Sequence, residues 1–343
     1  MMFRFLLFPF SLLFGVITFI RNKLYDWNFI SSVRYNDIFV ISVGNITVGG
    51  TGKTPFVEYL IRALSRKYRI AVLSRGYKRT SKGFRFVDSN STPADAGDEP
   101  YQIKRKFPNI TVAVDADRVN GINQIRNAYP DTQIILLDDA FQHRKIRPNL
   151  SILLVDYNRP LYRDCMLPSG NMREWSCFAN RADMMVITKS PADITPDKRK
   201  DIERRYARIF KHKLFFASIK YGEPQSVFFS DSLTMGHAPL LISTDDIKHY
   251  DVLLVTGIAY PKPFETFIRQ YAAIVQTVNF PDHHAFSEKD INYITEKWNT
   301  IPSVRKILLT TEKDAVRLRE IKFQEAIAIN SYYMPIEMVL TRG

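Results

Sequence analysis

A glycine-rich turn that ends in Gly-Lys-Thr constrains this chain more than any other feature. The run Gly49-Gly50-Thr51-Gly52-Lys53-Thr54 has the composition of a phosphate-binding loop. In such a loop the backbone N–H groups surround phosphate oxygens, the lysine reaches the β- and γ-phosphates, and the hydroxyl residue binds Mg²⁺. The strict pattern has glycine five places before Gly52, where this chain has Thr47, and Gly49 and Gly50 partly compensate. The motif predicts a site for ATP or GTP.

The residues on either side of the turn predict a strand before it and a helix after it. The run 38–43 is apolar and β-branched enough for a buried strand. After the turn, apolar residues recur at helical spacing, and Pro55 is tolerated in a first helical turn. This order places the positive end of the helix dipole against the nucleotide. We expect these residues to bind the nucleotide: Thr47, Gly49, Gly50, Thr51, Gly52, Lys53 and Thr54.

Length, charge and cysteine content narrow the class of protein. A chain of 343 residues with 45% hydrophobic and 24% charged residues is long enough for two folded domains. Its net charge of +13 favours anionic partners, although a solvated basic surface would have the same composition. Cys165 and Cys177 are the only cysteines, which indicates a reducing compartment and argues against a disulfide scaffold or a zinc site.

The N-terminal segment 5–20 is nearly all apolar, with Arg4 before it and Arg21 and Lys23 after it. Sixteen helical residues span about 24 Å, less than the roughly 30 Å of a bilayer core. The segment lacks the small-residue cleavage site of a signal peptide. A short spanning helix and a buried core helix remain alternatives, and we favour a monotopic anchor lying at the membrane surface. We therefore predict a membrane-associated helix over residues 1–24.

Further along, short apolar runs alternate with helical segments. Five runs read as buried strands, namely 69–74, 110–114, 133–137, 151–155 and 184–188. The charged stretch 193–213 predicts a solvated helix. We expect an α/β fold with a P-loop NTPase-type parallel sheet and helices on both faces over residues 25–213.

A second, smaller α/β domain is expected over residues 236–343, after linker strands at 214–235. Its candidate strands are 251–256, 271–275 and 306–310. The strand-like end 332–338 is expected to return and pair with the 214–229 segment.

Polar side chains follow several of these strands. Asp138 and Asp139 end the run 134–137, which is the form of a Walker B element that binds Mg²⁺. Gln142 and His143 come next and are expected in the same crevice. An ordinary pair of surface acids is the alternative.

Arg75, Tyr77 and Arg118 follow strands at the edge where ligands bind in such sheets, although surface ion pairing is the commoner role of a single arginine. Asp98 and Glu99 lie in a Gly-Asp-Glu-Pro loop that on its own is a common turn.

The sequence Phe280-Pro281-Asp282-His283-His284 suits a metal site, an acid–base site or a helix cap at Asp282. No third ligand lies at an obvious spacing, so zinc is not expected. Histidine titrates near neutral pH and suits removal of a proton from a hydroxyl during phosphoryl transfer.

Taken in order, these motifs closely resemble the tetraacyldisaccharide 4'-kinase family, the lipid A 4'-kinases of Gram-negative bacteria. The match runs from the apolar N-terminus to about residue 318. It includes the runs 42–45, 49–55, 74–77, 97–100, 138–143, 167–174, 280–284 and 310–314.

The resemblance implies transfer of the ATP γ-phosphate to the 4'-hydroxyl of a tetraacylated glucosamine disaccharide 1-phosphate at the cytoplasmic face of the inner membrane. It implies that Asp98 and a histidine, His283 or His284, form the acid–base pair, and we favour His283. It implies that Lys53 neutralises phosphate charge and that Thr54 holds Mg²⁺ with Asp138 or Asp139. By the same resemblance, these residues surround the nucleotide or the sugar phosphate: Arg75, Tyr77, Glu99, Arg118, Gln142, His143 and Arg173.

Some residues depart from the family pattern, and other functions remain possible for such a motif set. Ala140 stands where the family often has glycine, and Asn171 and Met172 differ from the residues that the family usually has before Arg173. The alternative function is a membrane-associated P-loop NTPase acting as a switch or assembly factor. A nucleic-acid-binding ATPase would leave the apolar N-terminus without a role, so we expect no nucleic-acid partner.

Overall fold

The computed structural model describes residues 2–228, 242–272, 274–282 and 284–341, with the side chains of residues 2–5 left out. The chain divides into two compact units, each described by itself below. Unit 1 comprises Met1–Ile219 and Met338–Gly343, and unit 2 comprises Lys220–Glu337. The domain limits expected from the sequence stay predictions.

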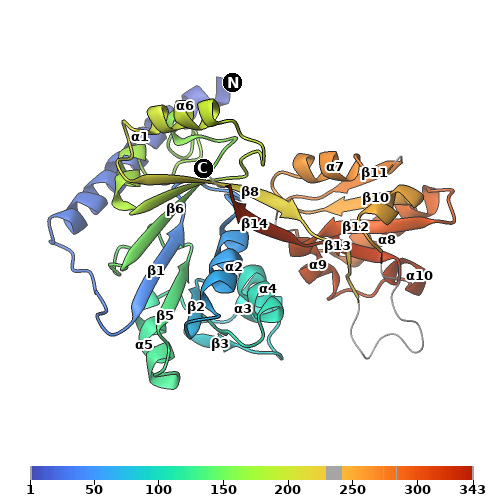
Figure 1. The fold of residues 1–343 in the computed structure, drawn as a ribbon, viewed down its shortest axis with the longest axis horizontal. Coiled ribbons are helices and arrows are strands. Elements are labelled where there is room, and N and C mark those ends of the chain that lie inside the picture. Colours follow the sequence, from blue (N-terminus) through green and yellow to red (C-terminus); the bar gives the residue numbers. More distant parts are fainter. Residues whose placement is uncertain (1, 229–241, 273, 283, 342–343) are drawn as a thin grey trace. The chain divides into compact units, whose positions relative to one another are not determined.

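Unit 1 is built on a nine-stranded sheet with the order β14-β8-β7-β6-β1-β5-β2-β4-β3 (Figure 1). Its strands are β1 (Phe39–Gly44), β2 (Ile70–Ser74), β3 (Arg85–Val87), β4 (Thr111–Val114), β5 (Ile134–Asp138), β6 (Leu150–Asp156), β7 (Met184–Thr188), β8 (Lys213–Tyr221) and β14 (Ile336–Leu340). The strands from β8 to β4 pair in parallel, and β3 pairs antiparallel at one edge. The predicted parallel sheet is confirmed.

Helices cover both faces of this sheet. They are α1 (Met2–Asp26), α2 (Lys53–Leu64), α3 (Pro93–Ala96), α4 (Asp98–Lys106), α5 (Arg118–Ala128) and α6 (Pro196–Tyr206), with 3-10 turns η1 (Leu161–Arg163) and η2 (Ser176–Arg181). Ile61 of α2 packs with Ile41 and Leu136 on one face, and Ile122 of α5 packs with Val40 on the other. The strands are therefore apolar on both sides, as their continuous hydrophobic runs indicate. The predicted solvated helix is α6, in which Ile202 and Tyr206 are the buried residues.

Unit 2 contains a five-stranded sheet with the order β11-β10-β12-β13-β9. Its strands are β9 (Gln225–Ser226), β10 (Asp251–Thr256), β11 (Val275–Asn279), β12 (Lys306–Thr311) and β13 (Ser331–Met334). Its helices are α7 (Lys262–Ile268), α8 (Glu288–Thr300), α9 (Glu312–Leu318) and α10 (Glu325–Ala328), with the 3-10 turn η3 (Asp245–His249). Phe264 of α7 packs on one face of the sheet, and Trp298 of α8 packs on the other.

Two details of unit 2 differ from the sequence predictions. The strand predicted at 271–275 instead begins at Val275, because the amides of Tyr271 and Ala272 bond back to Ile268 O at the end of α7. Asp282 caps no helix, because α8 begins at Glu288 and Ser287 is its N-cap. The return of the chain end is confirmed, since β13 pairs with β9 and β14 neighbours β8.

Candidate active site

The glycine turn connects β1 to α2, as the sequence predicts (Figure 1). Gly52 is the N-cap of α2 and has a φ of 81°, and Gly49 has a φ of 92°. Both values lie in the left-handed region, which glycine adopts without steric cost. Because α2 starts at Lys53, the loop and the N-terminus of α2 lie next to each other, an arrangement that suits phosphate binding.

Lys53 extends toward the two acids at the end of β5. Its Nζ lies 3.6 Å from Asp139 Oδ1 and 3.4 Å from Asn45 Oδ1. Arg173 approaches the same carboxylate, with Nη1 3.4 Å from Asp139 Oδ1. Asp139 has a φ of 49°, which is uncommon for a residue with a side chain. The structure thus brings three predicted site residues together, because Lys53 and Arg173 both approach the carboxylate of Asp139.

Asp138 is buried beside this cluster and has an unusual charge environment. It is 4% exposed, and its Oδ2 accepts a hydrogen bond of 3.2 Å from Ser74 Oγ. Within the described residues its Oδ1 has no hydrogen-bond partner. Burial, followed by the charge of Asp139, raises the pKa of Asp138 to about 6, although Lys53 opposes this shift. A buried carboxylate oxygen without a donor is suited to binding a cation.

Arg118 and His143 lie behind the acid pair. Arg118 is 3% exposed, and its Nη2 lies 3.5 Å from the backbone oxygen of Asp138. Burial is the largest cause that lowers the pKa of Arg118, and it also lowers the pKa of His143, to about 4, with a further contribution from Arg118. His143 is therefore neutral at physiological pH. Gln142 donates from Nε2 to Asn45 O at 2.8 Å, so it braces the start of the phosphate loop.

The remaining predicted residues of unit 1 follow β2 and open α4. Asp98 is the first residue of α4, and Gly97 before it has a φ of 92°. A Cβ on Gly97 would lie 3.0 Å from the backbone oxygen of Tyr77, so only glycine permits this close approach. The charge of Glu99 acts on Asp138, and the charge of Arg75 acts on Arg118.

Sequence reasoning missed several residues that shape the phosphate loop. Asn45 contacts both Lys53 and Gln142, and Ser74 binds Asp138. Lys189 donates to Gly50 O and lies 2.7 Å from Asp156 Oδ2. Asn45 and Ser74 each stand at the carboxyl end of a parallel strand, and this position could have identified them.

The histidine motif of unit 2 is described in part. His283 lies outside the described residues. His284 Nε2 lies 3.0 Å from Asp290 Oδ2, and the His284 ring stacks on Phe280 with centroids 4.7 Å apart. Asp282 pairs with Lys313 at 3.3 Å. Asp98 belongs to unit 1 and His284 to unit 2, so their pairing stays a prediction.

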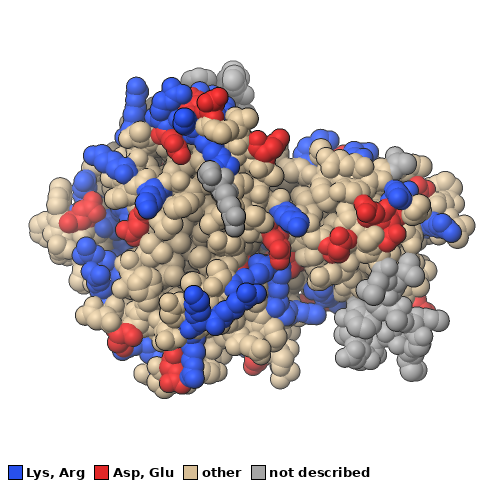
Figure 2. Space-filling model, in the orientation of Figure 1, with Lys and Arg blue, Asp and Glu red and all other residues tan. Residues whose placement is uncertain are grey.

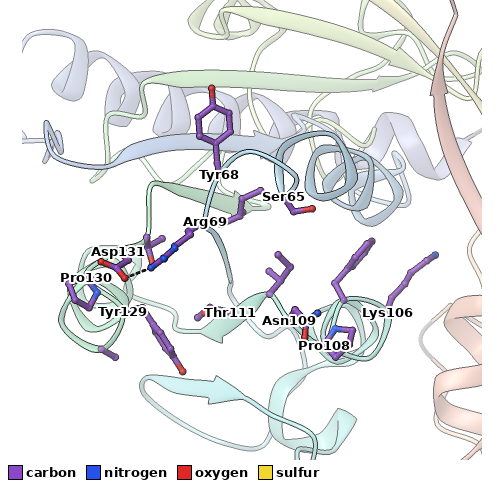
Figure 3. A pocket seen from close by; sticks show the side chains of 15 residues that line it. Ser65, Tyr68, Arg69, Lys106, Pro108, Asn109, Thr111, Tyr129, Pro130 and Asp131 are labelled. Carbon is purple, nitrogen blue, oxygen red and sulfur yellow. Dashed lines mark hydrogen bonds and ion pairs between the residues drawn. The ribbon is translucent and has the colours of Figure 1, made fainter.

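A cavity of about 800 Å³ lies at the amino ends of the unit 1 strands, opposite to the end at which the phosphate loop lies (Figure 3). It is lined by the segments that precede β2, β4 and β5, and Arg69 and Asp131 form an ion pair at its wall. The phosphate loop follows the carboxyl end of β1, whereas this cavity lies at the amino ends of parallel strands. None of the predicted site residues lines it, and we assign it no part in the reaction.

The surface charge is mixed. Lys and Arg are spread over the face drawn in Figure 2, with Asp and Glu between them. This pattern agrees with the dispersed positive charge in the sequence.

Comparison with known proteins shows the family of the chain. The family model described as Tetraacyldisaccharide-1-P 4'-kinase, LpxK, matches residues 3–343. The tetraacyldisaccharide 4'-kinase of Parabacteroides distasonis is 47% identical over 320 residues, which cover 92% of this chain and 84% of that protein. The enzyme of the same name from Flavobacterium johnsoniae is 45% identical over 334 residues, covering 97% of this chain and 92% of that protein.

A solved structure supports the same relationship. The crystal structure of LpxK from Aquifex aeolicus in complex with ATP has a TM-score of 0.75 and 29% sequence identity, and the match covers 99% of this chain and 96% of that one. This chain therefore belongs to the LpxK family of tetraacyldisaccharide 4'-kinases.

Proposed function

We propose that this chain transfers the γ-phosphate of ATP to the 4'-hydroxyl of a tetraacylated glucosamine disaccharide 1-phosphate, giving the 1,4'-bisphosphorylated lipid used in lipid A synthesis. The convergence of Lys53, Asp139 and Arg173 beside the phosphate loop carries this proposal. Phosphoryl transfer proceeds through a loose transition state, so the protein contributes mainly positioning and neutralisation of charge. In the proposal Lys53 reaches the terminal phosphates, and Arg173 neutralises charge on the transferred group.

Mg²⁺ fits the oxygen groups at this edge. Asp138 offers a buried oxygen that has no hydrogen-bond partner among the residues described, Asp139 adds a second carboxylate, and Thr54 follows the lysine as the hydroxyl residue of the motif. Carboxylate and hydroxyl oxygens are the ligands that Mg²⁺ prefers. In the proposal these three residues hold the ion, which supplies charge neutralisation to the phosphates.

The acceptor hydroxyl needs a base, and we assign that role to Asp98 with a histidine of the 280–284 motif. Asp98 opens α4, so its carboxylate is at a helix N-terminus, where negative charge is stabilised. His284 contacts Asp290, which can orient its ring. The other polar residues, namely Arg75, Tyr77, Glu99, Arg118, Gln142 and His143, are assigned to the nucleotide and the sugar phosphate.

The substrate carries four acyl chains, so the enzyme has to work at a membrane surface. Helix α1 is long and apolar enough to cross a membrane by length and composition. Its side chains Leu13 and Ile17 are 60% and 57% exposed, while Ser11 and Asn22 on another face are buried against Ser169 and Glu174 of the same unit. A helix held along its side by the folded unit suits a monotopic position, with its apolar face in the lipid. Because ATP is cytoplasmic, we propose the cytoplasmic face of the inner membrane.

An assay with γ-phosphate-labelled ATP and detergent-dispersed lipid acceptor tests the function. The proposed kinase transfers label to the disaccharide lipid. A membrane-associated NTPase switch would release only free phosphate, and this result would overturn the proposal.

A further inference from the structure

The segment 166–175 lies against the phosphate loop. Met172 forms an antiparallel bridge with Thr47. On either side of it, Val48 N–H donates to Asn171 O at 2.8 Å and Arg173 N–H donates to Ile46 O at 2.7 Å. The segment thus extends the start of the phosphate loop as a short two-stranded ladder, and it ends by presenting Arg173 to Asp139.

The same segment is held by helix α1. Ser11 and Ser169 form a hydrogen bond of 2.8 Å between their hydroxyl oxygens, and Ser169 N–H donates to Ser11 Oγ at 2.9 Å. Trp175 Nε1 donates to the backbone oxygen of Gly15 at 2.9 Å. A Cβ on Gly15 would lie only 2.6 Å from the Trp175 ring, so the indole rests directly on the helix backbone. These contacts recur at helical spacing and define one face of α1.

Glu174 lies at the centre of these contacts. It is 1% exposed, and its Oε2 accepts hydrogen bonds from Asn22 Nδ2 at 3.1 Å and from Arg181 Nη1 at 2.7 Å. Asn22 is itself fully buried. Arg181 also donates to Phe141 O at 3.3 Å and lies over the Phe141 ring at 4.5 Å. Phe141 is two residues beyond Asp139, so Glu174 is tied both to α1 and to the turn that carries the acid pair.

We propose that Asn22 and Glu174 are positioning residues that couple the seating of α1 to the geometry of the phosphate site. This inference rests on the proposed function of that site. Glu174 is adjacent to Arg173 in the chain, so its fixed carboxylate sets the path along which the Arg173 side chain approaches Asp139. Asp139 in turn pairs with Lys53. Helix α1 is therefore part of the support of the active site and does more than attach the protein to lipid.

The Glu174 carboxylate is a buried charge. A buried carboxylate requires its hydrogen-bond donors, because water cannot replace them. Glu174 Oε1 has no hydrogen-bond partner among the described residues. The two hydrogen bonds, from Asn22 and from Arg181, are both accepted by Oε2. Loss of the Asn22 donor leaves Arg181 as the remaining one, and the carboxylate is then drawn toward Arg181. Arg173 moves with it, and a displacement near 1 Å at a phosphoryl-transfer site can lower the rate about 10²-fold.

The test measures steady-state kinetics of the full-length chain with detergent-dispersed lipid, where attachment to a membrane is not limiting. The variants are Asn22→Ala and the isosteric Glu174→Gln, which loses the ion pair with Arg181. Lys23→Gln is the control, because Lys23 is the next residue of α1 after Asn22 and its ammonium group lies 3.6 Å from Asp26 of the same helix. We expect kcat to fall about tenfold or more in both test variants, with the KM for lipid and vesicle binding retained. The control is expected to keep wild-type kcat.

A double variant separates positioning from a purely structural role. If Asn22 acts through Arg173, then Asn22→Ala combined with Arg173→Ala loses no more activity than Arg173→Ala alone. Additive losses would overturn the inference, as would an Asn22→Ala enzyme that melts at a lower temperature but keeps wild-type kcat. Wild-type protein that transfers no label to lipid would instead refute the proposed function, so the two failures are distinguishable.

Discussion

Lys53 Nζ lies 3.6 Å from Asp139 Oδ1, so the lysine of the phosphate loop is paired with an acid of the neighbouring strand. Asn45 adds a weaker contact at 3.4 Å. This pairing holds an otherwise mobile ammonium group close to the N-terminus of α2. Bound phosphates would exchange one anionic partner for another, which keeps the cost of desolvating Lys53 small when the nucleotide binds.

Replacing Lys53 tests this arrangement. Lys53→Ala removes the cation at the start of α2, and we expect lipid phosphorylation to fall by about 10²–10³-fold or more, because Arg173 approaches the same carboxylate from another segment and does not stand at this helix N-terminus. Lys67→Ala is the control, because Lys67 is exposed just beyond α2 and its replacement changes the net charge by the same amount. Transfer of label from ATP to lipid measures both. An equal loss in the two variants would mean that net charge, and not position, explains the effect.

We predict that the ionised Asp138 carboxylate lowers the free energy of unfolding above about pH 6. Burial raises its pKa from 3.8 to about 6, so the folded state binds the proton more tightly than the unfolded state does. Stability from this group therefore falls as pH rises from about 4 to about 6, and the full penalty is present above that range. Asp138→Asn removes the charge, and we expect a higher melting temperature at pH 8, with a smaller gain at pH 5, where only part of the penalty is present.

Thermal melts without nucleotide or Mg²⁺ at both pH values measure this difference between variant and wild type. The same variant is expected to lose most kinase activity, because it removes a proposed metal ligand. A melting temperature that does not rise at pH 8 would contradict the assignment of a buried, poorly compensated charge.

Local sequence patterns predicted the phosphate loop, its strand and helix, and the acid pair, because each is encoded within a few residues. The contacts between distant segments could not be predicted in this way. Nothing in the run 166–175 indicates that Met172 pairs with Thr47, or that Glu174 is buried against Asn22. Such contacts depend on where loops close in space. The strand at β11 was misplaced for a local reason, since the apolar residues after Ile268 also suit the end of a helix.

His143 is predicted to affect stability in the opposite pH direction from Asp138. Burial, with a further contribution from Arg118, lowers its pKa to about 4, so the unfolded state binds more protons between about pH 4 and 6.5. Its contribution is present above pH 6.5 and is lost as pH falls toward 4. We expect His143→Gln to lose less stability than wild type between pH 7.5 and pH 5.

Urea unfolding at the two pH values measures this loss. His212→Gln, which removes an exposed histidine, is the control and is expected to behave like wild type. If His143→Gln and wild type lose equal stability on acidification, then the imidazole is not held neutral by its surroundings.

Asp98→Ala should separate catalysis from nucleotide binding. A general base typically contributes about 10²–10⁴-fold, so we expect kcat to fall within that range while the affinity for ATP changes little. Nucleotide binding is measured by calorimetry and kcat by labelled-lipid formation. Lost ATP binding with an unchanged turnover per bound nucleotide would place Asp98 in the nucleotide site instead.

The exposed face of α1 is expected to attach the protein to lipid. Leu13 and Ile17 lie on this face, away from Ser11 and Asn22. Burial of each side chain in a bilayer contributes about 1.5–3 kcal/mol to the free energy of membrane binding. Leu13→Glu with Ile17→Glu is expected to lower sedimentation with anionic vesicles by about 10²-fold or more. Val304→Glu changes another exposed aliphatic side chain, which is 99% exposed on unit 2, and should leave binding intact. The double variant keeps the Asn22–Glu174 contact, so we expect its kcat with detergent-dispersed lipid to stay near wild type. If that kcat falls together with vesicle binding, the exposed face of α1 takes part in catalysis, and attachment and positioning are not separate roles of the helix.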